Sequence, residues 1–284
     1  MTELKEKTAV AYSPSPRPTF EVPTLITRKS ATRHIWGDAD SGEVMDWIYV
    51  SSGKIHALVF GLAPGGGFRH SPEFRTVFGA DELLHVLSGA MIIANPETGE
   101  VRHIEAGSSV FFRADTWHHA FAHGEQPLRV LEIFAPSPSN GTSGAYARTR
   151  PYLEHSRYEQ ELVGVPAKSP DGASSFVHLR ESDIAYRLDG NVLSAPLAAT
   201  EHLVVSTISL SPSARSAIHE HAGDEVVYGL TGKSVVRAWA GSQTFVFEVE
   251  PDDLVYLPEG TVHEYRNFEG ETATALAGVA PGIR

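Results

Sequence analysis

The sequence predicts an all-β chain that folds into two antiparallel sandwich or barrel domains. Short runs of aromatic and β-branched residues alternate with turn residues at the spacing of strands. The spacing of a Glu, a Gly and a His that begins at Glu82 occurs again beginning at Glu225. The separation between the two copies is nearly the same at all three residues, which indicates an internal repeat. The length of 284 residues is sufficient for two domains of ordinary size.

The first half of the chain contains an arm and the first domain. We expect residues 1–31 to form an extended N-terminal arm, because the run SPSPRPTFEVP is rich in Pro and Ser. Such an arm can lie over the other domain, lie over a partner subunit, or be disordered. The first domain is predicted over 32–136. Its apolar runs lie in WGDADSGEVMDWIYVSSGKIHALVFGL and PLRVLEIFAP, and Asn95–Gly99 is a hairpin turn signal.

The second half contains a linker and the second domain. Residues 137–189 interrupt the strand pattern with the loop PSPSNGTSG and with RPYLEHSRYEQELVG, which has the pattern of a short helix. The second domain is predicted over 190–284. Its expected strands lie in NVLSAP, HLVVSTISLSP, SVVRAWAG, QTFVFEVE, DDLVYLP, HEYRNF and ALAGVAP.

The composition limits the classes of partner. A net charge of -12 argues against nucleic acid, which would need a basic face. No apolar run is long enough to span a membrane, and the N-terminus lacks the apolar core of a secretory signal, so we expect a cytoplasmic protein. The chain has no cysteine, which excludes disulfides and thiolate ligands.

The most informative residues are three histidines and a glutamate in the second domain: His219, His221, Glu225 and His263. Alternate residues of a strand share a face, so His219 and His221 point the same way. Glu225 follows a short turn, and His263 follows Pro258-Glu259-Gly260, a turn that would direct the next strand back to the same place. Three imidazoles and one carboxylate suit Fe, Mn, Ni, Cu, Co or Zn. The sequence therefore predicts a metal site.

At these residues the chain resembles the cupin superfamily. The residues that match the two cupin motifs are His219, His221, Glu225 and Gly232, followed by Pro258, Gly260, His263 and Asn267. The resemblance covers roughly residues 40–135 and 190–282, so the chain looks like a bicupin. It implies two double-stranded β-helix barrels of the jelly-roll-like cupin type, with the four ligands pointing into the lumen. Cupins include dioxygenases, decarboxylases, isomerases, lyases and binding proteins, so the motifs do not fix the reaction.

The first copy of the motif is degenerate. The positions of its two motif histidines fall on Thr76 and Phe78, and Arg113-Ala114-Asp115 replaces the Pro-x-Gly turn. Glu82 and His118 are retained, and two ligands rarely hold a transition metal. Two further histidines lie near this motif, at His70 and His85, and strand parity places His85 on the face opposite to Glu82. We therefore expect the first barrel to hold no metal and its interior to be filled with apolar side chains.

Strand parity also indicates which residues surround the second site. Tyr265 and Asn267 share the parity of His263 and are expected to line the lumen. Arg237 lies on a strand whose face the sequence does not determine; pointing inward, it would indicate an anionic substrate. The candidate catalytic residues are Glu225, Tyr265 and Arg237. No site for an organic cofactor is predicted.

The resemblance leaves three functions open. The one we favour from the sequence is an Fe(II) dioxygenase that oxidises a small organic molecule. The alternatives are a non-redox decarboxylase, isomerase or lyase that uses Mn, Ni or Zn, and a binding module without turnover. The expected cofactor is one divalent transition metal per chain, with iron favoured and Mn, Ni, Zn, Cu or Co compatible. The expected partners are a small-molecule substrate and further copies of the chain, in a homodimer or a higher homo-oligomer.

Overall fold

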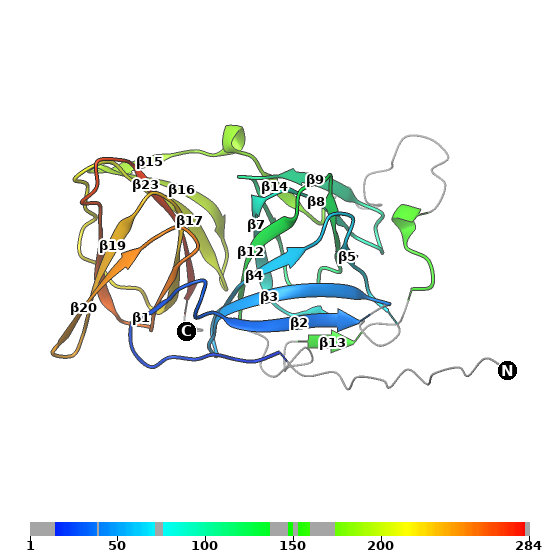
Figure 1. Cartoon of the computed structure of the whole chain (residues 1–284), viewed down its shortest axis with the longest axis horizontal. Helices are drawn as coiled ribbons and strands as arrows, with labels where there is room; N and C mark the ends of the chain where they lie inside the picture. The colour runs from blue at the N-terminus through cyan, green and yellow to red at the C-terminus, as the bar shows by residue number, and fades with distance from the viewer. Residues whose placement is uncertain are drawn as a thin grey trace.

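The regular secondary structure of the described residues is almost entirely β-strand, as predicted. The computed structural model describes residues 15–38, 40–71, 76–136, 147–149, 153–159 and 174–281. These residues form two β-rich lobes that lie side by side, the first built mainly from the N-terminal half and the second from the C-terminal half (Figure 1). Among the described residues, no helix is long and apolar enough to cross a membrane.

The strands of the first half follow the expected apolar runs. They are β1 (Thr24–Ile26), β2 (Thr32–Asp38), β3 (Gly42–Ser51), β4 (His56–Leu62), β5 (Gly67–Phe68), β6 (Thr76–Phe78), β7 (Asp81–Ser88), β8 (Ala90–Ala94), β9 (Val101–Glu105), β10 (Ser109–Phe112), β11 (His119–His123), β12 (Leu128–Ala135) and β13 (Ala147–Thr149).

The second half continues with further strands and two single turns of 3₁₀ helix. The elements are η2 (Arg157–Glu159), β14 (Val177–Leu179), η3 (Glu181–Asp183), β15 (Arg187–Asp189), β16 (Val192–Ala199), β17 (Val204–Leu210), β18 (Gly223–Thr231), β19 (Ser234–Ala240), β20 (Gln243–Val249), β21 (Leu254–Leu257), β22 (Val262–Arg266) and β23 (Ala273–Pro281). The short helix expected in RPYLEHSRYEQELVG is present only as the single turn η2, and the rest of that segment, apart from 153–156, lies outside the described residues.

The two lobes repeat the same sheet topology. One seven-stranded sheet has the order β14-β10-β7-β12-β4-β3-β2, and the other has the order β1-β21-β18-β23-β17-β16-β15. Each is accompanied by a smaller sheet, β5-β11-β8-β9 in the first lobe and β20-β19-β22 in the second. Position by position, β7 corresponds to β18 and β10 to β21. The internal repeat inferred from the sequence is therefore present as two equivalent barrels.

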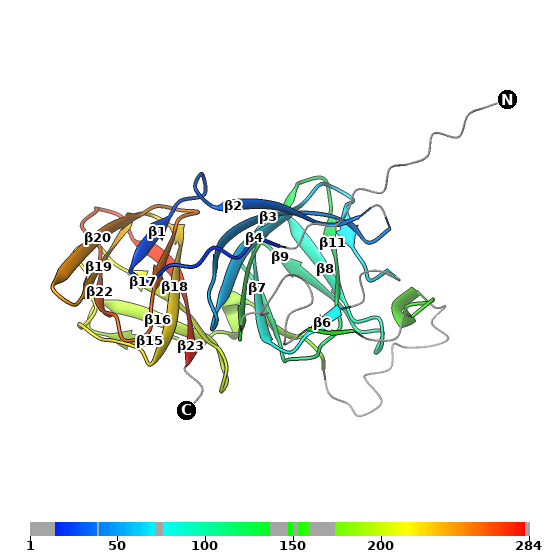
Figure 2. The ribbon, with the colours of Figure 1, turned by 90° about the horizontal axis from the view of Figure 1, so that it is seen from below.

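The two barrels exchange edge strands. β1 precedes the first barrel in the chain but pairs with β21 of the second, from Thr24 opposite Tyr256 to Ile26 opposite Leu254. β14 precedes the second barrel but pairs with β10 of the first. Figure 2 shows β1 lying against the second lobe while β2 and β3 belong to the first. The described part of the expected arm thus crosses to the other barrel, and the predicted linker contains a strand of the first sheet.

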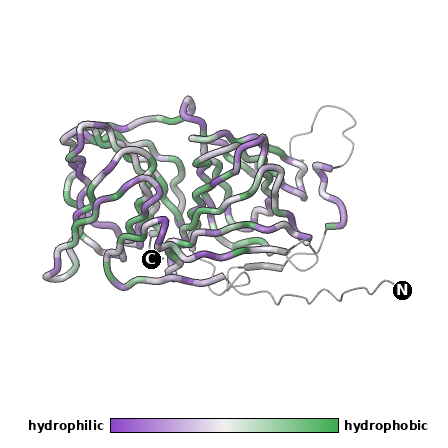
Figure 3. The backbone as a smooth tube through the Cα atoms, in the orientation of Figure 1, coloured by the Kyte–Doolittle hydropathy of each residue, from purple (hydrophilic) through white to green (hydrophobic). Residues whose placement is uncertain are grey.

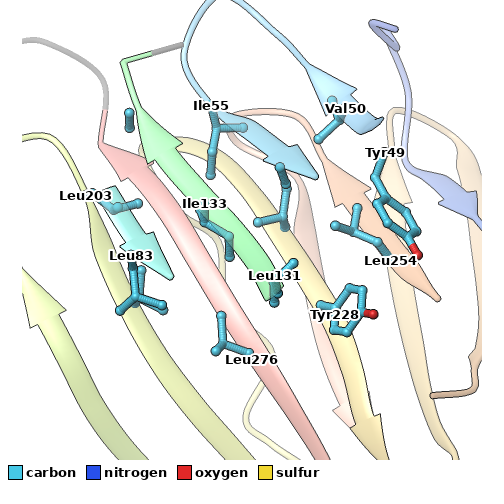
Figure 4. Packing of buried hydrophobic residues seen from close by; sticks show 14 of the residues in the cluster. Tyr49, Val50, Ile55, Leu83, Leu131, Ile133, Leu203, Tyr228, Leu254 and Leu276 are labelled. Atoms are coloured by element: carbon cyan, nitrogen blue, oxygen red, sulfur yellow. The ribbon is translucent and has the colours of Figure 1, made fainter. Parts of the chain in front are cut away.

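Apolar residues form three cores. One lines the lumen of the first barrel, one fills the lumen of the second, and the largest lies between the two seven-stranded sheets. Hydrophobic residues alternate with hydrophilic ones along the strands of both lobes (Figure 3). In the shared core, Leu131 and Ile133 of the first barrel lie close to Tyr228 and Leu276 of the second (Figure 4). This burial of apolar surface joins the two barrels into one unit.

Two aspartates make equivalent polar contacts across the shared core. Asp224, which precedes Glu225, accepts a hydrogen bond at 2.6 Å from the Ser52 hydroxyl of the first barrel. Asp81, which precedes Glu82, accepts one at 2.6 Å from the Thr200 hydroxyl of the second. Both carboxylates are buried. The repeat therefore provides the interface with two copies of one polar contact.

We expect Asp224→Ala to lower the free energy of unfolding by about 2–4 kcal/mol, because it leaves buried hydrogen-bond donors without an acceptor. Those donors include the hydroxyls of Ser52 and Tyr256, at 2.6 and 2.8 Å from the carboxylate. Chemical denaturation measures the change. The exposed Glu248→Ala is the control and should alter stability by less than about 0.5 kcal/mol. Equal stability of the two variants would contradict the role given to Asp224.

Candidate metal centre

The four predicted ligands come together at one end of the second barrel. His219 and His263 face each other in an antiparallel bridge, with N–H to O distances of 2.9 and 2.8 Å in the two directions. His263 lies on β22, and Glu225 lies on β18. The Gly260 amide donates to the carbonyl of His221 at 3.0 Å, which joins the turn before β22 to the segment before β18.

The turn that precedes His263 has the geometry that the sequence predicted. Gly260 adopts a φ of 74°, in the left-handed region that favours glycine. The Thr261 amide closes the turn on the carbonyl of Pro258 at 3.1 Å. This turn lets β22 begin at Val262 and brings His263 back over the barrel end.

The side-chain atoms that could bind a metal are close together. One ring nitrogen from each of His219, His221 and His263 lies within 4.8 Å of the others. Glu225 Oε2 lies 3.0 Å from His263 Nε2 and 3.7 Å from His221 Nε2. Adjacent ligands on one transition metal lie about 3 Å apart when the metal–ligand bonds are 2.0–2.2 Å. The spacing fits a single ion.

Two of the histidines already have the tautomer that a metal ligand needs. Nδ1 of His219 lies 2.9 Å from the carbonyl of Ala217, and Nδ1 of His263 lies 2.9 Å from the carbonyl of Thr261. A carbonyl can only accept, so each Nδ1 carries a proton, and in the neutral imidazole each Nε2 then presents a lone pair. Hydrogen bonds of this kind orient metal-binding histidines in general.

Glu225 supplies a buried carboxylate with one unused oxygen. Its Oε1 accepts a hydrogen bond from the Tyr265 hydroxyl at 2.5 Å, and its Oε2 is buried without a hydrogen-bond partner. Burial acts to raise the pKa of Glu225, but the close approach of His263 to the carboxylate outweighs burial and lowers it. The carboxylate is therefore ionised. A metal ion is the partner that an ionised, unpaired oxygen among imidazole nitrogens would take.

Tyr265 lies where strand parity predicted, beside the candidate ligands. It is buried, and its hydroxyl contacts Glu225 and lies 3.2 Å from His263 Nε2. Burial, followed by the charge of Glu225, raises the pKa of Tyr265 well above its usual range. The phenol therefore remains a hydrogen-bond donor at neutral pH.

The structure does not bring Arg237 to the site, which corrects its assignment as a catalytic candidate. Arg237 lies directly opposite Glu264 on the neighbouring strand, whereas Ala238 lies opposite His263. Residues that are opposite on paired strands share a face, so Arg237 and His263 are on different faces of this sheet. The guanidinium lies 3.6 Å from Glu264 and packs over the ring of Trp239.

Asn267 shares the parity of His263 but braces a loop. Its side-chain amide donates to the carbonyls of Leu210 and Glu271 at 2.9 and 2.7 Å, and its oxygen accepts from the Glu269 amide at 2.8 Å. These three bonds use both amide hydrogens and one of the two acceptor positions of the oxygen. Asn267 was expected to line the lumen, and its side chain instead holds the backbone around Leu210, Glu269 and Glu271.

The lumen behind the candidate metal centre is filled with small apolar side chains. They include Val227, Val236, Ala238, Val255 and Ala277. His219 and His221 are only half-buried, whereas Glu225 and His263 are fully buried. The open side of the site is therefore the side of His219 and His221.

The equivalent residues of the first barrel do not form a similar group. Among the described residues, the only set of three or more potential ligands within binding distance of one another is the histidine set of the second barrel. Phe78 occupies the position of one lost histidine and stacks on Phe134. His85 pairs with Ser109 on the face away from Glu82, as strand parity predicted. His70 contacts the ring of His119, with ring nitrogens 2.8 Å apart.

Sequence reasoning missed a group of carboxyls that point into the first barrel. Glu132 occupies an inward position of β12, between the apolar residues Val130 and Phe134, and shares a hydrogen bond with Glu82. Burial, followed by the charge of Asp46, raises the pKa of Glu132. Burial, followed by the charge of Glu132, raises that of Glu82 well above its usual range. An acidic residue at an inward strand position was the signal that could have revealed them.

We expect Glu132→Gln to reduce the loss of stability that accompanies a rise in pH. A carboxyl with a raised pKa keeps its proton in the folded state above about pH 4.3, where the unfolded chain loses it. Its contribution to stability is therefore present below that pH and is lost as the pH rises toward the folded-state pKa. Thermal unfolding between pH 4.5 and 8 measures the slope. The exposed Glu105→Gln is the control, and its stability should fall with pH as steeply as that of the unmodified protein. An equally steep fall in Glu132→Gln would contradict a protonated Glu132 in the folded state.

Comparisons with known proteins agree with this architecture. A family model described as Cupin domain matches residues 58–134 and 206–278. No curated protein sequence matches the chain.

The chain is also similar to solved structures of oxalate decarboxylases. The enzyme of Lactobacillus farciminis in complex with formate is 15% identical with a TM-score of 0.64, over 91% of this chain and 86% of that one. A variant of the Bacillus subtilis enzyme is 13% identical with a TM-score of 0.66, over 93% and 79%. A Bacillus subtilis structure studied for its Mn(II) centres is 13% identical with a TM-score of 0.64, over 94% and 80%. At these identities the similarity establishes the fold.

Proposed function

Because the chain belongs to the cupin domain family and is a bicupin, we propose that its second barrel is the site of a metal-dependent, non-redox enzyme. The proposed reaction is a decarboxylation, or a related lyase reaction, of a small organic acid. The observation that carries this proposal is the convergence of three imidazoles and the unpaired Glu225 oxygen at one barrel end. The similar structures support this reaction class over the dioxygenase that we favoured from the sequence, since they are decarboxylases and one was studied for Mn(II).

The metal would be held by His219, His221, Glu225 and His263. Once bound, a divalent ion such as Mn(II) supplies a Lewis acid that polarises a carboxylate and withdraws its charge. The absence of cysteine leaves nitrogen and oxygen as the available strong ligands, and this donor set also accepts Fe, Ni, Co or Zn.

The remaining residues hold the ligands and limit the substrate. The Tyr265 hydroxyl fixes the orientation of Glu225 through the bond to Oε1, so that Oε2 faces the imidazoles. Val227, Val236 and Ala238 fill the lumen behind them, and water and substrate would enter past the half-buried His219 and His221. A narrow space of this kind favours a small acid, with its carboxylate at the metal and little else enclosed.

The test uses the full chain loaded with Mn(II), with oxalate as the first acid and formate release as the readout. We expect formate to appear with the metal-loaded protein and to be absent with His263→Ala. A panel of other small mono- and dicarboxylic acids, followed by release of CO₂, extends the test. Consumption of O₂ by the Fe(II)-loaded protein with no CO₂ release from any acid would replace this proposal with the dioxygenase.

Assembly into a homodimer or larger oligomer is a separate prediction, which light scattering measures.

A further inference from the structure

The first barrel contains a cavity of about 130 Å³ in its lumen. An apolar cavity of about 150 Å³ is large enough to hold benzene, so this one suits a molecule with a single ring or a short branched chain. Its mouth is bordered by Ser15, Pro16 and Arg17 of the N-terminal arm and by the exposed Arg69. The cavity lies in the barrel whose metal motif is degenerate, so the metal-site proposal leaves it without a role.

Aromatic rings form much of the cavity wall. The aromatic side chains that line it are Trp36, Phe60, Phe68, Phe78 and Phe134. Phe78 and Phe134 stack with ring centroids 5.6 Å apart, and Trp36 meets Phe68 edge-on at 5.7 Å. The faces of such rings carry partial negative charge and attract cations.

Two carboxyl groups line the same cavity. Asp46 and Glu132 lie on inward positions of β3 and β12, and Glu82 lies behind Glu132 and shares a hydrogen bond with it. Glu82 Oε2 is buried without a hydrogen-bond partner. Three acidic side chains therefore occupy one region of an apolar lumen, where each ionised form is costly unless a cation pairs with it.

Among the described residues, the basic side chains around the cavity leave Glu132 and Glu82 without a cation, and Asp46 has one imidazole beside it. His34 lies 3.4 Å from Asp46 and is the imidazole that acts on this carboxyl. Burial lowers the pKa of His56 to about 3 and that of His118 to about 4, so both are neutral at pH 7. Arg69 forms an ion pair with Glu159, and Arg17 donates to the carbonyl of Ser52 at 3.1 Å. The pKa values of Glu82 and Glu132 are shifted by burial and by other carboxyl groups.

We propose that the lumen of the first barrel binds a small organic ammonium compound with an apolar body of about one ring. The ammonium group pairs with Glu132 and Asp46, and the apolar body lies against the rings of Phe60, Phe68 and Phe134. Carboxylates combined with aromatic faces are the chemistry that recognises organic cations. A carboxylate ligand can form no ion pair with Glu132 or Asp46. This site is separate from the metal centre, so it does not depend on the proposed decarboxylation.

Three probes of one shape test the proposal: benzylamine as the cation, benzyl alcohol as the neutral analogue and benzoate as the anion. Titration calorimetry with the full metal-loaded chain should give benzylamine a dissociation constant at least about tenfold lower than either analogue. Glu132→Gln should remove most of that preference and leave the affinity for benzyl alcohol unchanged. Benzylamine binding should also release protons at pH 7, because pairing ionises a carboxyl that is protonated in the free protein; titrations in two buffers with different ionisation enthalpies measure this release.

Two variants distinguish binding in this cavity from binding elsewhere in the chain. His263→Ala, in the second barrel, should leave benzylamine binding intact, since the cavity is in the first. Phe78→Trp should block the cavity by filling it and should abolish binding of all the probes. Equal binding of the three probes, tighter binding of benzoate, or full benzylamine affinity in Glu132→Gln would each overturn the proposal. Loss of benzylamine binding in His263→Ala would move the amine to the metal centre and would overturn it as well.

Discussion

Replacing His263 by alanine should lower the affinity of the chain for a divalent metal by more than about 100-fold. This loss is larger than the one expected for a residue that only orients a metal ligand. His263 is the most enclosed of the three histidines, with a side chain that is 1% exposed, and its Nε2 lies 3.0 Å from Glu225 Oε2. Its loss removes one ligand and the nearest of the imidazoles around the buried Glu225 carboxylate. Elemental analysis of the purified, untagged chain measures the loss.

His118→Ala is the matched control for this substitution. His118 occupies the same place in the first barrel, and its Nδ1 faces the carbonyl of Thr116 as that of His263 faces Thr261. Both variants remove an imidazole from the interior of a barrel, so a general effect of lost packing should appear in both. Only His263→Ala should lose bound metal. Full metal occupancy in His263→Ala, or an equal loss of metal in His118→Ala, would contradict a single metal centre in the second barrel.

Tyr265→Phe should weaken metal binding or turnover by about 10- to 100-fold while the chain remains folded, which is the range for residues that orient metal ligands. The substitution removes only the hydroxyl that donates to Glu225 Oε1 and lies 3.2 Å from His263 Nε2. Without it, Glu225 can rotate and its carboxylate has a further buried oxygen without a partner. Competition with a chelator of known affinity measures the metal dissociation constant.

Tyr228→Phe provides the comparison for Tyr265→Phe. Tyr228 is also buried, and its hydroxyl donates to Asp252 at 2.7 Å in the core between the barrels. Its loss should lower stability and leave the metal dissociation constant unchanged. Metal binding that is equally weak in the two variants would attribute the effect of Tyr265 to general destabilisation, and unaltered binding in Tyr265→Phe would remove its positioning role.

The sequence was sufficient to predict the fold and the grouping of most candidate metal ligands, because both depend on local rules. Strand parity and turn chemistry act over a few residues, and they correctly brought His219, His221 and His263 together and placed Tyr265 beside them. The internal repeat further predicted that the two barrels have equivalent topology. The exchange of β1 and β14 could not be foreseen, since a three-residue edge strand has no pattern that identifies its partner sheet.

The errors arose where the outcome depends on neighbouring strands. Arg237 was ambiguous because its face depends on its register with β22, where it lies opposite Glu264. Asn267 had the right parity, but it follows the last residue of β22, where alternation no longer applies. The cavity of the first barrel was missed because the loss of ligands was taken to mean that apolar side chains fill the lumen. The volume that remains depends on side-chain packing over many strands, which a linear pattern does not contain.

The most direct test of the metal centre is anomalous X-ray scattering from crystals of the full chain loaded with Mn(II), recorded on both sides of the manganese absorption edge. We expect one peak per chain, in contact with Nε2 of His219, His221 and His263 and with Glu225 Oε2, and no peak in the first barrel. A peak beside Glu82, Glu132 or His118, or a second barrel without manganese at saturating concentration, would contradict a single metal centre at these four ligands.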